Sequence, residues 1–133
     1  FGDAGRPEVH ASLVDPFGDA PLEERARSYL DANCGHCHQP GGNGGASGLV
    51  LLASEREPVK NGICKAPVAA GPGSGERHFD IVPGVPDESI LMLRMESTDP
   101  EVKMPEIPNR LPHEPGIALI RAWIQSLPQD GCD

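Results

Sequence analysis

Aromatic side chains are scarce in this chain of 133 residues, which contains one Trp, one Tyr and three Phe. The chain also has no apolar run that approaches the ~20 residues of a transmembrane helix, and it shows no signal peptide. Lys and Arg number 11 against 20 Asp and Glu, which gives a formal net charge of −9 without any basic run. These absences argue against a transmembrane segment and against nucleic acid as a partner, because nothing here neutralises phosphates.

Regular secondary structure has little room, because 16 glycines and 15 prolines make up more than a fifth of the chain. Residues 1–20 lack an apolar period, and we interpret them as an N-terminal arm or linker. Residues 21–133 then form one domain with a modest core, which needs a further apolar surface to pack around. No segment alternates convincingly with period two, so we expect an all-α fold with three main helices and long loops.

Three segments carry apolar residues at helical spacing. The first begins at Pro21 and runs into Cys34. The second begins near Pro86 and closes at Asp99, and the third covers the apolar positions of residues 117–127. The first of these helices matters most, because it leads directly into the most informative stretch of the chain.

That stretch is Cys34-Gly35-His36-Cys37-His38. Two cysteines separated by two residues and followed at once by histidine are typical of covalent haem attachment. Each thiol adds to one vinyl group on the same edge of the porphyrin, and Cys-x-x-Cys on a helical turn spans those two carbons. The next residue places an imidazole under the iron as proximal ligand. We therefore expect one covalent haem c, held by Cys34 and Cys37, with His38 bound to the iron.

Two other kinds of site use the same cysteine spacing. A thioredoxin-like Cys-x-x-Cys should open a helix after a β-strand, whereas a helical pattern precedes this motif. A zinc ribbon needs a second Cys-x-x-Cys, whereas Cys64 and Cys132 stand alone. The sequence thus favours haem attachment over both alternatives.

With Cys34, Cys37 and His38 placed, residues 21–128 resemble the class I c-type cytochromes. The resemblance implies a cytochrome c-like fold around one haem, in which the first and last helices cross. The contacts expected at that crossing are those of Tyr29 or Leu30 with Leu119, Ile120 or Trp123.

Residues 81–91, followed by a Met-Pro pair, look like a particular bacterial group of such domains. In that group the domain occurs alone or fused behind larger extracellular enzymes, including sugar-dehydrogenase-like propellers. One feature departs from the family. Many class I proteins have a Gly-Pro pair shortly after the histidine, whose carbonyl accepts the Nδ1 proton of that histidine. Here the corresponding place reads Gly48-Leu49, so the hydrogen-bond acceptor for His38 stays open.

The expected sixth ligand of the iron is Met104, which lies in an extended, proline-flanked loop. Met92 and Met95 lie on the second predicted helix, where core packing accounts for both. His78 and His113 are weaker distal candidates, because they lie in or beside loops and suit surface positions. A His/Met pair in a mostly apolar pocket favours the ferrous state and hence a high reduction potential.

Arginines are candidates for contacts to the haem propionates, because the guanidinium fork matches a carboxylate. Arg94 and Arg77 are the two that we single out, with a solvated surface role as the alternative for each.

Cys64 and Cys132 remain after the haem takes its pair of thiols. Covalent haem attachment takes place outside the cytoplasm, so we expect a periplasmic or extracellular bacterial protein whose chain is processed or trimmed before Phe1. In an oxidising compartment two remaining cysteines usually join. We predict a disulfide between Cys64 and Cys132, with two free thiols as the alternative.

The expected function is electron transfer by a haem that cycles between Fe(II) and Fe(III), either as a carrier or as a domain of a larger dehydrogenase. No catalytic constellation is evident, so the chain itself is not expected to be an enzyme. Expected partners are redox proteins, to whose basic patches the acidic chain would dock, and a fused or associated dehydrogenase. The alternatives are a peroxidase-like haem enzyme and a gas sensor, both of which need a labile sixth ligand.

Overall fold

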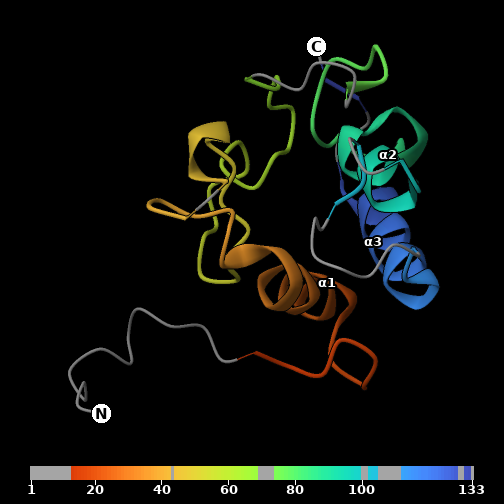
Figure 1. The fold of residues 1–133 in the computed structure, drawn as a ribbon. Coiled ribbons are helices and arrows are strands. Elements are labelled where there is room, and N and C mark those ends of the chain that lie inside the picture. The colour runs from red at the N-terminus through yellow and green to blue at the C-terminus, as the bar shows by residue number, and fades with distance from the viewer. Residues whose placement is uncertain are drawn as a thin grey trace.

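A computed structural model of the protein describes residues 13–42, 44–68, 74–99, 102–104, 112–128 and 131–132. Its regular structure comprises three α-helices, α1 (Leu22–Leu30), α2 (Ile90–Glu96) and α3 (Glu114–Ser126), joined by long irregular segments (Figure 1). Within the described ranges no strand forms, and extended backbone pairs only at two isolated bridges. This agrees with the predicted all-α class. None of the described helices is both long and apolar enough to cross a membrane.

Helix α1 continues without a break into the segment that carries Cys34. Glu23 and Glu24 stand in its first turn, where negative charge favours the positive end of the helix dipole. A π-helical turn, η2 (Asp31–Gly35), follows directly after Leu30. Helical backbone therefore reaches the first cysteine of the motif, as the sequence predicts.

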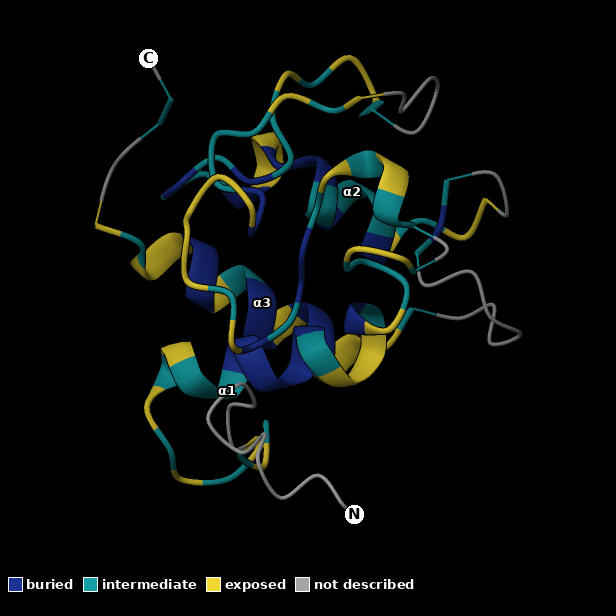
Figure 2. Ribbon diagram, turned by 90° about the vertical axis from the view of Figure 1, so that its left-hand side faces the viewer, coloured by how far each residue is buried: buried dark blue, intermediate teal, exposed yellow. Residues whose placement is uncertain are grey.

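Helices α1 and α3 pack against each other, and the buried residues gather where they meet (Figure 2). One core cluster contains Tyr29, Leu30, Leu119, Ile120 and Trp123. At this contact Gly116 leaves room for Tyr29, because a Cβ at position 116 would overlap the tyrosine ring and hydroxyl. The first and last helices thus pack together, as expected, and they bury the residues that sequence analysis named.

The described part of the predicted N-terminal arm lies against these two helices. The Val14 N–H donates to Ser28 Oγ over 2.9 Å. The Phe17 ring meets Tyr29 and His113 edge-on, at centroid distances of 6.1 and 6.0 Å. Residues 13–20 are therefore packed onto the helical domain, and residues 1–12 lie outside the described part of the chain.

Helix α2 is shorter than the predicted second helix. A separate 3-10 turn, η5 (Pro86–Glu88), precedes it, and Ser89 between the two is extended and fully buried. The Ser89 hydroxyl donates to Val85 O (3.1 Å) and accepts the Val82 N–H (2.8 Å). These bonds to the preceding loop keep Ser89 out of the helix, so α2 begins only at Ile90. The helix ends at Glu96, before Asp99.

The irregular middle of the chain is tied down by pairings distant in sequence. Cys64 and Cys132 form a disulfide with their Cα atoms 5.5 Å apart. The Cys64 N–H donates to Ile81 O, and the Asp80 N–H donates to Lys65 O. Lys65 and Asp80 also form a largely buried ion pair with Nζ and Oδ2 3.7 Å apart. The long loop is therefore held to the C-terminal end and to the segment before α2.

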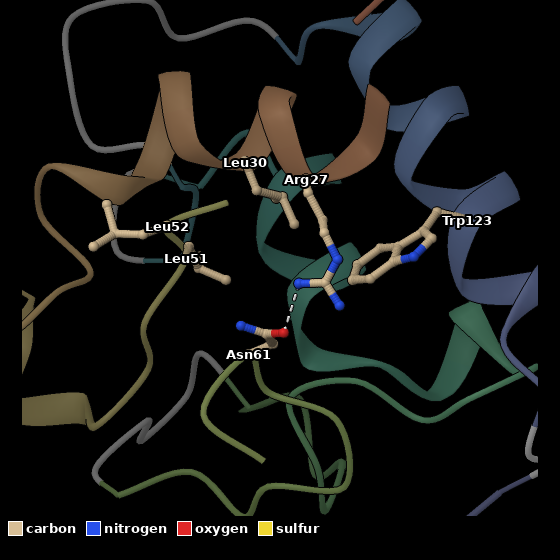
Figure 3. Close-up of a pocket in the computed structure, with 6 residues that line it drawn as sticks. All are labelled: Arg27, Leu30, Leu51, Leu52, Asn61 and Trp123. Carbon is tan, nitrogen blue, oxygen red and sulfur yellow. Dashed lines mark hydrogen bonds between the residues drawn. The ribbon is translucent and has the colours of Figure 1, made fainter. Parts of the chain in front are cut away.

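A buried arginine joins α1 to this loop. Arg27 donates to Asn61 Oδ1 (2.7 Å) and to the Glu55 carbonyl (3.1 Å), and its charge is paired with Glu23 (3.0 Å). Its guanidinium also lies over the Trp123 ring, 5.9 Å from the centroid. A small cavity of about 10 Å³, close to the room that one water needs, is lined by Arg27, Leu30, Leu51, Leu52, Asn61 and Trp123 (Figure 3).

Candidate functional site

The Cys34–His38 motif forms one tight helical turn. The His38 N–H donates to Cys34 O over 2.9 Å, and the Cys37 N–H donates to the same carbonyl over 3.2 Å. A bond from residue i+4 back to residue i places Cys34 and His38 on one side of the turn. Both thiols are free and half-buried. Two unpaired thiols and an imidazole are therefore held within a single turn at the end of α1.

Burial controls the chemistry of the first thiol. Burial, with a smaller contribution from the neighbouring Cys37, raises the pKa of Cys34 to about 12. Redox-active and nucleophilic Cys-x-x-Cys sites instead have lowered thiol pKa values, because the thiolate is the reactive species. Burial also raises the pKa of Tyr29, with a smaller contribution from Cys34. The electrostatics of this turn are thus unlike those of a thioredoxin-like dithiol.

The zinc alternative lacks further ligands in the part of the chain that the structure describes. Cys64 and Cys132 are joined to each other, so their sulfurs are not available as thiolate ligands. Among the described residues no group of three or more His, Cys, Asp or Glu side chains gathers as a metal cage. No second ligand pair therefore lies beside the Cys34–His38 turn among the residues that the structure describes.

A glycine-rich loop closes onto the motif. The Gly44 N–H donates to Cys37 O over 2.8 Å. A Cβ on Gly44 would lie 2.9 Å from both Cε1 and Nδ1 of His38, and a Cβ on Gly42 would lie 2.5 Å from Cys37 O. Side chains at these two positions would displace the loop. Glycine is therefore required here because the loop backbone packs directly on the His38 ring.

The far end of this loop reaches the same imidazole. Ser47 ends a 3-10 turn, η3 (Gly45–Ser47), and its Oγ lies 3.4 Å from His38 Nδ1. The Leu51 N–H donates to His38 O over 2.9 Å, which anchors the backbone on the other side. His38 is thus fixed by contacts from residues 44–51, and sequence analysis did not anticipate Ser47.

Met104 is held next to helix α2. Its N–H donates to the Arg94 carbonyl over 2.9 Å, and its neighbour Lys103 is buried. Its side chain is half-buried, and the residues that follow, 105–111, lie outside the described part of the chain. Met92 and Met95 lie in the core cluster, which confirms the packing role expected of them. The role of Met104 as an iron ligand stays a prediction.

The two arginines that sequence analysis singled out lie near α2. Arg77 donates from Nε to the Asp87 carbonyl over 2.9 Å and from Nη1 to the Gly75 carbonyl over 3.3 Å. Arg94 is half-buried and close enough to Asp80 to lower the pKa of that carboxyl. Contacts of either guanidinium to propionates stay predictions. The most buried arginine described is instead Arg27, whose only signal in the sequence is its i,i+4 spacing from Glu23.

The structure describes three other histidines, His36, His78 and His113, and all three are exposed. His113, at the start of α3, stacks on Tyr29 with a ring-centroid distance of 5.7 Å. Its Nδ1 lies 2.9 Å from the Tyr29 hydroxyl. His113 thus takes part in the packing of α1, α3 and the N-terminal segment.

Because comparison with known proteins found no match, a function can be argued only from the residues of the site. No protein-family model matches the chain, and neither the curated proteins nor the solved structures compared with it show a significant match.

Proposed function

We propose that this protein transfers electrons through one haem c, attached covalently to Cys34 and Cys37 and bound at its iron by His38. The observation that carries the proposal is the single turn at the end of α1, which holds two free thiols and an imidazole. The spacing matches two thioether bonds to one porphyrin edge with a proximal histidine next to them. The donor set therefore fits the group.

The surroundings of His38 support the same proposal. Glycines at 42 and 44 bring backbone against the turn on one side, and Ser47 approaches the imidazole Nδ1. A proximal histidine needs this kind of fixation, because the contacts of its second nitrogen set the orientation of the ring toward the metal. When bound, the haem supplies the Fe(II)/Fe(III) couple. The chain would hold the imidazole that binds the iron in place through Gly44 and Ser47.

Met104 is our candidate for the second residue that would bind the iron. The hydrogen bond from its N–H to the Arg94 carbonyl and the burial of Lys103 hold the start of its loop against α2. A thioether binds iron weakly, so the protein must hold it in place. Such a filled sixth position suits a carrier rather than an enzyme or a gas sensor, which need an open site.

The partners that we propose are redox proteins of the periplasm or cell exterior. The net charge of −9 suits a basic docking patch, and association should then slow as the ionic strength rises. The donor is either a separate dehydrogenase or an enzyme of which this chain forms a domain.

Carbon monoxide binding distinguishes an electron carrier from a peroxidase-like enzyme or a gas sensor. The purified, dithionite-reduced holoprotein is mixed with carbon monoxide in a stopped-flow spectrometer, and a redox titration is recorded on the same sample. A reversible one-electron couple with no rapid spectral change on mixing is the result expected of a carrier. Rapid and complete carbon monoxide binding would show an open sixth position and would favour the enzyme or the sensor.

A further inference from the structure

The hydroxyl of Ser47 lies between three polar groups. Its Oγ is 2.8 Å from Gly44 O, 3.2 Å from the Leu49 N–H nitrogen and 3.4 Å from His38 Nδ1. Two of these partners have only one possible role. A backbone carbonyl accepts hydrogen bonds, and a backbone N–H donates them. Only the role of the imidazole nitrogen depends on where the ring carries its proton.

The distances around the hydroxyl favour one role for that nitrogen. A serine hydroxyl has a single proton and two lone pairs. The short contact to Gly44 O uses the proton, and the Leu49 N–H uses one lone pair. Toward His38, Oγ then has a lone pair to offer, an arrangement that favours the hydrogen on Nδ1. In the neutral imidazole the lone pair then resides on Nε2, which is the nitrogen available to ligate a metal.

We propose that Ser47 is the positioning residue that fixes the tautomer and orientation of His38, so that Nε2 faces the iron. The inference rests on the proposed haem function. It fills the place for which the sequence offers no Gly-Pro carbonyl: a side-chain hydroxyl accepts the Nδ1 proton here. Because this acceptor is a side chain, its contribution can be removed by substitution, which a backbone carbonyl does not allow.

The backbone around Ser47 places the hydroxyl firmly. The Ser47 N–H donates to Gly44 O over 3.1 Å, and Gly48 ends the turn in the left-handed region at φ 75°. Gly44 lies directly on the imidazole, because a Cβ there would come within 2.9 Å of Nδ1. The ring is therefore held between a glycine backbone and a hydroxyl that belong to the same short turn.

The hydrogen bond has an electronic consequence for the ligand. An acceptor at Nδ1 raises the basicity of the imidazole and so strengthens its donation to the metal, which favours the ferric state. Removal of the hydroxyl should therefore raise the midpoint potential and lower the Fe–His stretching frequency. The proton on Nδ1 should also exchange faster with water, because its hydrogen bond to the Ser47 hydroxyl is then lost.

The test uses the holoprotein and three variants. Ser47→Ala removes the acceptor, Ser47→Thr keeps a hydroxyl, and Ser54→Ala removes an exposed hydroxyl elsewhere as the matched control. The midpoint potential is measured by redox titration, and the Fe–His stretch by resonance Raman spectroscopy after photolysis of the carbon monoxide adduct in a Met104→Ala background. We expect an upward potential shift and a lower frequency in Ser47→Ala only, with parent-like values in Ser47→Thr and Ser54→Ala.

Solvent exchange of the His38 Nδ1 proton in the ferrous parent, followed by NMR after ¹⁵N-histidine labelling, decides the point even if Ser47→Ala yields no holoprotein. A protected Nδ1 proton in the parent and in Ser47→Thr is expected. Unchanged potential and frequency in a haem-loaded Ser47→Ala variant, or an unprotected proton in the parent, would overturn the role of Ser47 alone. Absence of covalent haem from the parent would instead overturn the proposed function.

Discussion

The ring of Tyr29 on α1 occupies the space that a side chain at position 116 of α3 would need. In most helices a Gly→Ala change is favourable by about 0.5–1 kcal/mol, because alanine has the better helix propensity. At this contact the added methyl group must displace either the tyrosine or the helix. We expect Gly116→Ala to destabilise the protein by about 1–3 kcal/mol, as overpacking does.

Urea unfolding of the single variant measures this cost. The double variant Tyr29→Leu/Gly116→Ala supplies the control, because the shorter side chain of leucine frees the space. The two changes should be strongly non-additive. Stabilisation by Gly116→Ala alone would show that α1 and α3 do not meet in this way.

The buried guanidinium of Arg27 should contribute more to stability than the exposed guanidinium of Arg56. Arg27→Ala leaves the buried Asn61 Oδ1 without its Arg27 donor, and it removes the cation over Trp123. The Glu55 carbonyl loses one of its two donors and keeps the Asn61 amide at 3.1 Å. Unsatisfied buried acceptors are costly, so we expect a loss of about 2–3 kcal/mol in the free energy of unfolding. Arg56→Ala is the matched control. Its contacts with Glu23 and Glu24 are exposed, and such pairs contribute less than about 1 kcal/mol. Equal losses in the two variants would contradict the structural role of Arg27.

Part of the fold and of the candidate site could be predicted from the sequence. Local periodicity is enough to place α1 and α3, and the Cys-x-x-Cys-His spacing alone points to the motif turn. The late start of α2 was missed because Ser89 bonds to Val82 and Val85 in the folded loop, a tertiary effect that overrides the helical pattern. Ser47 and the Arg27–Asn61 pair were missed for the same reason. Their polar partners come together only once the loops close, and no local signal marks them.

The buried carboxyl of Asp80 should make the stability of the protein depend on pH in a defined direction. Burial raises the pKa of this carboxyl, and Lys65, followed by Arg94, lowers it only in part. The folded state therefore binds the proton more tightly than the unfolded state. For this group stability is highest in acid and falls as the pH rises through the window above the unfolded pKa.

Asp80→Asn cannot ionise and resembles the protonated parent. Its stability relative to the parent should therefore increase as the pH is raised from about 4 to about 7, through the window where a raised carboxyl titrates. Urea denaturation of both proteins across this range provides the measurement. A relative stability that stays constant, or that decreases with pH, would show that the carboxyl is not disfavoured by burial.

Met104 predicts a spectroscopic change without a change of fold. If its sulfur is the sixth ligand, Met104→Ala should lose the far-red charge-transfer band of the ferric protein, lower the midpoint potential and bind small ligands. Met92→Leu and Met95→Leu are the matched controls, because both methionines lie in the core and leucine conserves their volume at a cost of less than about 1.5 kcal/mol. Loss of the band in a control, with a parent-like Met104→Ala, would move the assignment elsewhere.

Attachment of the haem at the motif turn is the central claim, and intact mass under denaturing conditions tests it most directly. The chain is produced in a periplasm with c-type maturation, unfolded in acid and analysed by mass spectrometry. We expect the mass of the chain plus one haem, which organic extraction does not remove. The Cys34→Ala/Cys37→Ala double variant should carry none, and Cys64→Ala/Cys132→Ala should carry it as the parent does. A parent chain at its unmodified mass, or haem lost on extraction, would contradict the account.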